Sequence, residues 1–196
     1  MQNLVRKQLN DSIATFQRVI ADEDLINTVV EAGNKTAEAM LAGRKLMVGG
    51  NGGSAADAQH LVAEFVSRLT VDRPALRAVA LTTDTSILTA IGNDYSYDNV
   101  FERQIEALGQ PGDVFMGIST SGNSKNILKG LAQAKKMGLT TIGYSGNGGG
   151  QMLPLCDYNV VIPSNVTMNI QECHLALEHI YCMVVERCYF GPDFGK

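Results

Sequence analysis

A run of glycines between an apolar segment and a helix-forming segment constrains the fold of this chain more than any other feature. Residues 46–48 read Leu-Met-Val and predict a short buried strand. Positions 49–53 hold four glycines and one asparagine, and Ser54 is suited to be the N-cap of the helix that follows. A strand, a glycine turn and a helix start in this order let backbone N–H groups approach a ligand, and the helix dipole favours an anion there.

The glycine turn alone leaves the ligand open. Gly50-x-Gly52-x-x-Ala55 fits a dinucleotide-binding turn, which also requires an acidic residue at the end of the next strand. That strand, predicted at 77–81, ends in two threonines and Asp84 comes late, so we expect no nucleotide cofactor. A P-loop is excluded because no Lys-Ser or Lys-Thr closes the turn. A plain tight connection between strand and helix stays possible.

Length and composition bound the class of protein. A chain of 196 residues with 45% apolar and 18% charged residues is typical of one globular domain, expected to span residues 1–196. The net charge of −4, without a lysine or arginine cluster, argues against nucleic acid or a membrane as the partner, although backbone amides can bind a small anion. The chain shows no signal peptide, no membrane-spanning run and no Cys-x-x-Cys pair, so we expect a cytoplasmic protein with reduced thiols.

Helices and strands are expected to alternate along the chain. Apolar spacing predicts two leading helices, at residues 3–20 and about 22–41, and a long final helix from about 169 to 190. Short apolar strands that alternate with helices are typical of a parallel sheet covered on both faces, so we expect an α/β, three-layer sandwich with a five-stranded parallel sheet flanked by helices. After the first strand, the remaining four are predicted at 77–81, 114–118, 140–144 and 158–162.

A serine-rich loop is predicted at the carboxyl end of the strand at 114–118, where ligands bind in parallel sheets. Residues 119–124 read Ser-Thr-Ser-Gly-Asn-Ser, so four hydroxyls surround one glycine. A helix cap needs only one hydroxyl, whereas several hydroxyls and helix-start amides together can donate to a phosphate. The loop contains no arginine or lysine, which suits a phosphate monoester that must be released. A serine-rich cap and turn is the structural alternative.

The three histidines fall into two predicted helices. His60 lies four residues before Glu64 in the helix after the glycine turn, so both side chains face the same side. His174 and His179 lie in the final helix. A lone histidine on a helix is more often structural than a ligand, and we interpret His174 in that way.

Taken together, these segments resemble the sugar isomerase (SIS) domain family. The resemblance rests on the Gly-Asn-Gly-Gly-Ser turn at 50–54, the serine-rich loop at 119–124 and the segment 170–179. It covers nearly the whole chain, including the leading helices and residues 90–94, but not the tail 191–196. Within the family, the chain is most similar to the isomerases that convert sedoheptulose 7-phosphate to D-glycero-D-manno-heptose 7-phosphate, the first step towards ADP-heptose and the lipopolysaccharide core.

The resemblance implies a homotetramer that binds a small sugar phosphate and one zinc ion per subunit. It implies zinc ligands at His60, Glu64, Gln171 and His179. It places the phosphate at the four hydroxyl residues of the serine-rich loop. The full set of implied substrate contacts is Asn51, Gly52, Gly53, Glu64, Asn93, Asp94, Ser119, Thr120, Ser121, Ser124 and Gln171.

The implied reaction needs a base that moves a proton between C1 and C2 and an acid that moves protons between the two oxygens. We assign Glu64 as the base and His179 as the acid. The alternative is a non-catalytic SIS-domain protein that binds the replication initiator or acts as a sugar-phosphate regulator. The initiator-binding relative lacks an acid at the position of Glu64 and a histidine at that of His179, so the enzyme is favoured. Whether zinc is catalytic, structural or adventitious stays open, and Gln171 is an atypical zinc ligand.

The spacing of Gln171 and His179 bears on assembly. Eight residues along a straight helix correspond to about 12 Å of rise and roughly 80° of rotation. Two side chains so placed reach one small ion only with difficulty. We therefore expect active sites at subunit interfaces of a tetramer, with His60 and Glu64 from one chain and His179 from a neighbour.

Overall fold

Five short strands form one parallel sheet in the order β2-β1-β3-β4-β5. They belong to a computed structural model that describes residues 1–195. The prediction of an α/β protein with a five-stranded parallel sheet is confirmed, and each strand lies within two residues of its predicted position. The strands are β1 (Leu46–Gly50), β2 (Ala78–Ala80), β3 (Val114–Ser119), β4 (Thr140–Ser145) and β5 (Tyr158–Val161).

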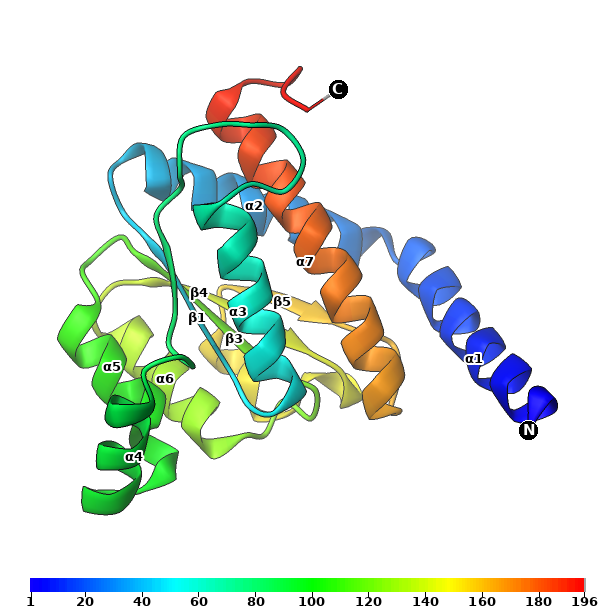
Figure 1. The fold of residues 1–196 in the computed structure, drawn as a ribbon, viewed down its shortest axis with the longest axis horizontal. Helices are drawn as coiled ribbons and strands as arrows, with labels where there is room; N and C mark the ends of the chain where they lie inside the picture. The colour runs from blue at the N-terminus through cyan, green and yellow to red at the C-terminus, as the bar shows by residue number, and fades with distance from the viewer. Residues whose placement is uncertain (196) are drawn as a thin grey trace.

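Helices cover both faces of the sheet (Figure 1). One face carries α2 (Glu23–Leu41), α3 (Gly53–Val66) and α7 (Thr167–Phe190). The opposite face carries α4 (Thr85–Asp94), α5 (Val100–Leu108) and α6 (Lys125–Lys136), together with the short 3-10 helices η1 (Tyr97–Asn99) and η2 (Asn147–Leu155). No helix among residues 1–195 is both long and apolar enough to span a membrane.

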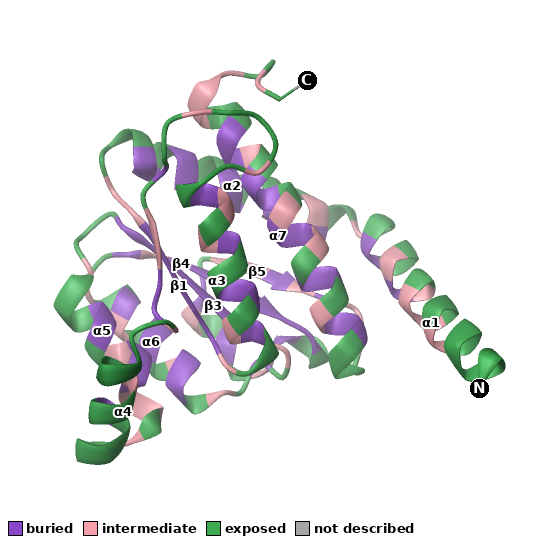
Figure 2. Ribbon diagram, in the orientation of Figure 1, coloured by how far each residue is buried: buried purple, intermediate pink, exposed green. Residues whose placement is uncertain are grey.

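The two apolar cores follow from the alternation of side chains along the strands, which point to opposite faces in turn. In β1, Leu46 and Val48 pack with α2, α3 and α7, whereas Met47 packs with the helices of the other face. In β3, Met116 and Phe115 divide in the same way. The central strands β1, β3 and β4 are therefore buried almost throughout, whereas the edge strands β2 and β5 are only partly buried (Figure 2).

The first helix, α1 (Gln2–Ile20), lies away from the sheet and packs mainly against α2 and α7 (Figure 1). Its apolar stripe is mostly open to solvent, with Leu9 59% and Ile13 54% exposed. An apolar stripe of this length is normally covered.

Two helix boundaries differ from the sequence-based predictions. Ser54 is not the N-cap of α3, because the helix starts at Gly53 and Ser54 lies buried in its first turn. The chain turns so tightly after β1 that a Cβ at Gly50 would lie 2.2 Å from the Ser54 carbonyl oxygen. Residues 92–95 read Gly-Asn-Asp-Tyr, which predicts a turn, but α4 continues to Asp94.

Candidate active site

The carboxyl ends of β1 and β3 form the topological switch point of the sheet, because β1 leads into α3 on one face and β3 leads into α6 on the other. Ligands of such sheets bind in the crevice outside these strand ends. Asn51, directly after β1, lies opposite Asn126 in the first turn of α6. Each side-chain amide donates to the oxygen of the other, at 2.9 Å and 2.7 Å. The Tyr97 hydroxyl also donates to Asn51, at 3.3 Å. Neither Asn126 nor Tyr97 was predicted from the sequence. Asn126 could have been found, because it is a polar residue in the first helical turn after the serine-rich loop.

The hydroxyls of the serine-rich loop gather on one side of this crevice. Ser119 Oγ lies 2.8 Å from Ser124 Oγ and 3.4 Å from Ser121 Oγ. Ser124 is the N-cap of α6, but its hydroxyl makes no hydrogen bond to the described part of that helix and turns towards Ser119. The start of α6 and the hydroxyl cluster thus lie together, as an anion-binding loop requires.

The glycine-rich segment 146–150, for which the sequence predicted no role, contacts and supports this loop. Gly122 has a φ of +66°, and a Cβ there would lie 2.0 Å from the Gly149 carbonyl oxygen. The backbone N–H of Gly146 and the side chain of Asn147 both donate to the Thr120 carbonyl, at 3.1 Å and 3.0 Å. The backbone of the serine-rich loop is therefore held from the side of η2.

His60, Glu64 and His179 converge between α3 and α7. His60 Nε2 lies 2.8 Å from His179 Nε2 and 3.5 Å from Glu64 Oε1. One ligand atom from each residue lies within 4.8 Å of the others. The pair His60 and Glu64 lies on α3, and His179 lies on α7.

All three side chains come from a single chain, so the expectation that a neighbouring subunit supplies His179 is wrong. The physical reason is that α3 and α7 lie side by side and run in the same direction (Figure 1). Near the start of α3, Gly53 lies against Gln171, and near its end the Phe65 ring meets the Tyr181 ring. Matching turns of the two helices thus face each other within one protomer.

Gln171 contacts a different group. Its Nε2 donates to Asp57 Oδ2 at 3.0 Å, and a Cβ at Gly53 would lie 2.4 Å from the same nitrogen. Burial raises the pKa of Asp57, while the hydrogen bond from Gln171 lowers it. Gln171 therefore lies over the start of α3, about two helical turns before His179. A cavity of about 300 Å³ adjoins it, lined by Asp57, Met168, Gln171, Glu172 and Leu175.

The predicted contact residues of α4 lie near the crevice but contact each other. Asn93 donates to the Asp94 carboxylate at 2.8 Å, and both side chains are exposed. Three residues beyond Asp94, Tyr97 reaches Asn51. The end of α4 therefore borders the crevice, next to Asn51 and the glycine turn with Gly52.

A buried polar group that sequence reasoning missed lies behind the histidines. Glu178 is fully buried, and neither carboxyl oxygen has a hydrogen-bond partner among the described residues. Burial, and to a lesser degree the charge of Asp57, raises the pKa of Glu178 to about 8.

His174, one turn earlier on α7, is buried against the ring of Tyr144, and its Nε2 lies 3.0 Å from the Ser145 carbonyl oxygen. Burial lowers the pKa of His174 to about 4. This buried environment agrees with a structural role for His174.

The converging side chains suit a metal ion. Two imidazole nitrogens and a carboxylate oxygen are ligands that zinc prefers, and three protein ligands with one open position are typical of catalytic zinc sites. The separations of 2.8 Å and 3.5 Å from His60 Nε2 are close to what one small ion between these atoms requires. His60, Glu64 and His179 therefore fit zinc.

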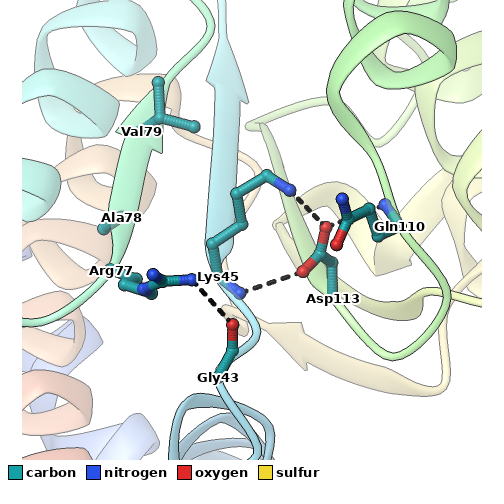
Figure 3. A pocket seen from close by; sticks show the side chains of 7 residues that line it. All are labelled: Gly43, Lys45, Arg77, Ala78, Val79, Gln110 and Asp113. Carbon is teal, nitrogen blue, oxygen red and sulfur yellow. Dashed lines mark hydrogen bonds and ion pairs between the residues drawn. The ribbon is translucent and has the colours of Figure 1, made fainter.

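A second cavity, of about 370 Å³, lies at the opposite end of the sheet (Figure 3). There Lys45 pairs with Asp113 at 2.5 Å, and the Asp113 carboxylate also accepts from the backbone N–H groups of Lys45 and Gln110. Arg77 donates to the Gly43 carbonyl at 2.9 Å. These bonds join the loops at the amino ends of the strands.

Comparisons with known proteins identify the family. The SIS domain matches residues 9–146. Phosphoheptose isomerase 2 of Campylobacter jejuni is 51% identical over 100% of this chain and 98% of its own length. The phosphoheptose isomerase of Burkholderia pseudomallei is 52% identical over 98% of this chain and 100% of its own length. The solved phosphoheptose isomerase of Neisseria gonorrhoeae superimposes with a TM-score of 0.89 at 39% identity, covering 94% of this chain and 98% of that one. The chain belongs to the phosphoheptose isomerase family of SIS-domain proteins.

Proposed function

We propose that this protein is an aldose–ketose isomerase that converts sedoheptulose 7-phosphate to D-glycero-D-manno-heptose 7-phosphate, the first step towards ADP-heptose and the lipopolysaccharide core. The observation that carries the proposal is the convergence of His60, Glu64 and His179 on α3 and α7, two helices that meet at the glycine turn through Gly53 and Gln171, in a chain that also has a hydroxyl-rich loop at its strand ends. The names of the relatives, at about half identity over the full chain, support the same reaction.

The crevice would bind the substrate from both ends. Ser119, Thr120, Ser121 and Ser124 hold the phosphate through neutral donors, which anchors the far end of the sugar. The binding energy at the phosphate then positions the reacting carbons at the acid–base pair. The remaining contacts would come from Asn51, Gly52, Gly53, Asn93, Asp94 and Gln171.

We assign the proton transfers to Glu64 and His179. The Glu64 carboxylate removes a proton from C1 of the ketose and returns it to C2. His179 gives a proton to the oxygen on C2 and accepts one from the oxygen on C1. The enediol that forms between these transfers has the same atoms as the substrate, so no other reactant is needed.

A zinc ion would be held by His60, Glu64 and His179, with Gln171 as the fourth candidate. Bound there, it would supply a Lewis acid that polarises a substrate oxygen. A carboxylate that ligates a metal is a weaker base, so the role of Glu64 depends on whether zinc occupies the active enzyme. Metal analysis of the purified protein, with activity before and after chelation, tests this point, since full activity in metal-free protein would remove zinc from the mechanism.

An assay with sedoheptulose 7-phosphate separates the enzyme from a regulator. The non-catalytic alternative requires only the phosphate loop, whereas the enzyme also requires the acid–base pair. Turnover that disappears in Glu64→Gln supports the isomerase. Tight binding to the replication initiator without any turnover would support the alternative.

We also infer that the chain associates with copies of itself, as a homotetramer. The exposed stripe of α1 is one apolar surface that needs cover. A second is a groove of about 330 Å³ between α1, α2 and α7, lined by Phe16, Val19, Ile20, Ile26, Val29, Val30, Ala176, Leu177 and Ile180. Light scattering on the wild type and on Leu9→Glu tests the inference, because a charge on the stripe should reduce the mass of the particle.

A further inference from the structure

The loop between α3 and β2 inserts one fully buried side chain between α3 and α7. Arg73 lies in an otherwise mostly exposed segment, yet its side chain has 0% exposure. Its guanidinium donates from Nη2 to the Glu64 carbonyl at 2.7 Å and from Nη1 to the Phe65 carbonyl at 2.8 Å. Its Nε donates to Glu186 Oε1 at 2.6 Å, and the Glu186 side chain is 4% exposed.

This arrangement caps the carboxyl end of α3. The last four carbonyl groups of a helix have no partners within the helix, and a cation near them is favoured by the helix dipole. Ser67 N–H satisfies the Ala63 carbonyl, and Leu76 N–H gives the Phe65 carbonyl a second donor. Among the described residues, Arg73 is the sole donor to the carbonyl of Glu64.

The other half of the contact reaches α7. Glu186 is seven residues after His179, about two helical turns, so it lies on nearly the same side of α7. The planar guanidinium therefore connects the backbone of the residue that carries the carboxylate to the helix that carries His179. A lysine has one nitrogen and cannot make three such bonds in a fixed geometry.

We propose that Arg73 is a positioning residue, which fixes the Glu64 side chain against His60 and His179 by joining the end of α3 to α7. The proposal rests on the proposed function. Loss of this clamp leaves the hydroxyl-rich phosphate loop, at the other strand ends, intact. It should therefore impair the proton transfers and metal binding more than the binding of substrate.

The first test is Arg73→Lys in the full chain, which keeps the charge and removes the three-way bond. We expect kcat to fall by about 10- to 100-fold, as a misplacement near 1 Å can cause. The KM for sedoheptulose 7-phosphate should change less than about twofold. The affinity for zinc, measured by competition with a chelator, should fall by about 10- to 100-fold, as it does when the support of a metal ligand is removed.

Asp113→Asn is the matched control. Asp113 is also a buried carboxylate in an ion pair, with 1% of its side chain exposed, but it pairs with Lys45 and joins the loops before β1 and β3 rather than α3 to α7 (Figure 3). We expect it to lower the unfolding temperature and to leave kcat and zinc affinity within about twofold. If Arg73→Lys affects kcat and zinc affinity no more than this control does, Arg73 is only structural and the proposal fails.

A double variant, Arg73→Met with Glu186→Leu, separates positioning from stability. Apolar replacement of a buried ion pair often preserves stability, but here it leaves the Glu64 carbonyl without its donor. Recovered stability with kcat and zinc affinity still reduced supports positioning, whereas recovery of all three overturns it. A wild type without turnover refutes the proposed function instead, and the zinc measurement then tests Arg73 by itself.

Discussion

His60 Nε2 and His179 Nε2 lie 2.8 Å apart, although 119 residues separate them in the chain. At this distance one ring nitrogen must donate and the other accept, or both must ligate one cation. The two rings therefore hold either one proton or one ion between them. Glu64, at 3.5 Å from His60, is the nearest carboxylate to this shared position. The three residues should act as a unit, and their mutational effects should not be additive.

Glu64→Gln should keep the fold and lose turnover by roughly 10²- to 10⁴-fold, because the shape is preserved and the proton acceptor is lost. Steady-state kinetics with sedoheptulose 7-phosphate measure the effect. Glu106→Gln, an exposed change on α5, is the control and should be neutral. Near-normal isomerisation by Glu64→Gln would mean that another group is the base.

Mixed assemblies of two inactive variants should stay inactive. Glu64→Gln and His179→Ala each remove one member of a set that a single chain supplies, so every site in a mixed oligomer lacks one of them. The two proteins would be unfolded together, reassembled and assayed after mass spectrometry has verified mixing. Regained activity would show that each site takes residues from two chains.

Ser121→Ala and Ser124→Ala should each weaken substrate binding by about 0.5–3 kcal/mol, the range for a lost hydrogen bond to a charged acceptor. Calorimetry gives the affinities, and inorganic phosphate should compete with the substrate. Thr28→Ala is the control, because that hydroxyl bonds to its own helix on α2. A dinucleotide site predicts the opposite pattern, with no effect of the serines and binding of a nicotinamide cofactor.

Stability should fall between about pH 6.5 and 8 because of Glu178. Its folded pKa is raised from 4.5 to about 8, so in this window the unfolded carboxyl is ionised while the folded one keeps its proton. The unfolded state then binds fewer protons, and the unfolding free energy should decrease by roughly 1.4 kcal/mol per pH unit. His174, lowered from 6.5 to about 4, acts in the opposite direction below pH 6.5, where the two slopes oppose each other.

Urea unfolding of metal-free protein at several pH values measures this slope. Glu178→Gln should abolish the decrease above about pH 6.5, whereas Glu172→Gln, an exposed neighbour on α7, should retain it. The other groups that interact electrostatically with Glu178 are Asp57 and Tyr144. A wild type whose stability is flat from about pH 6.5 to 8 would show that the folded carboxyl is already ionised.

The parallel sheet and the alternation of strands and helices along the chain could be predicted from the sequence, because apolar strands and glycine turns are local signals. The motifs at 50–54 and 119–124 were located for the same reason, since both directly follow strands. The exact first and last residues of the helices could not be predicted in this way. Ser54 has the chemistry of a cap, but the close approach of Gly50 to its carbonyl moves the helix start to Gly53.

The parts of the site that depend on tertiary packing could not be predicted. The spacing of eight positions from Gln171 to His179 predicts a site shared by two chains. The parallel contact of α3 and α7 instead brings His179 to His60 within one chain and leaves Gln171 beside Asp57. The buried state of Glu178 and the clamp made by Arg73 likewise depend on which helix packs on which. A sequence pattern shows on which side of a helix an acidic residue lies, but it does not show which other element packs against that side.

The near contact of Gly122 with the Gly149 carbonyl limits how this protein could be re-engineered. No side chain can be introduced at 122 unless the backbone around 149 moves away, and Gly149 itself has a φ of +85° that L-residues rarely adopt. In a library of the serine-rich loop designed to accept a larger anion, every variant with a side chain at 122 would therefore clash with the segment 146–150. A workable graft would transplant residues 119–124 and 146–150 together, as one cassette from a single donor protein.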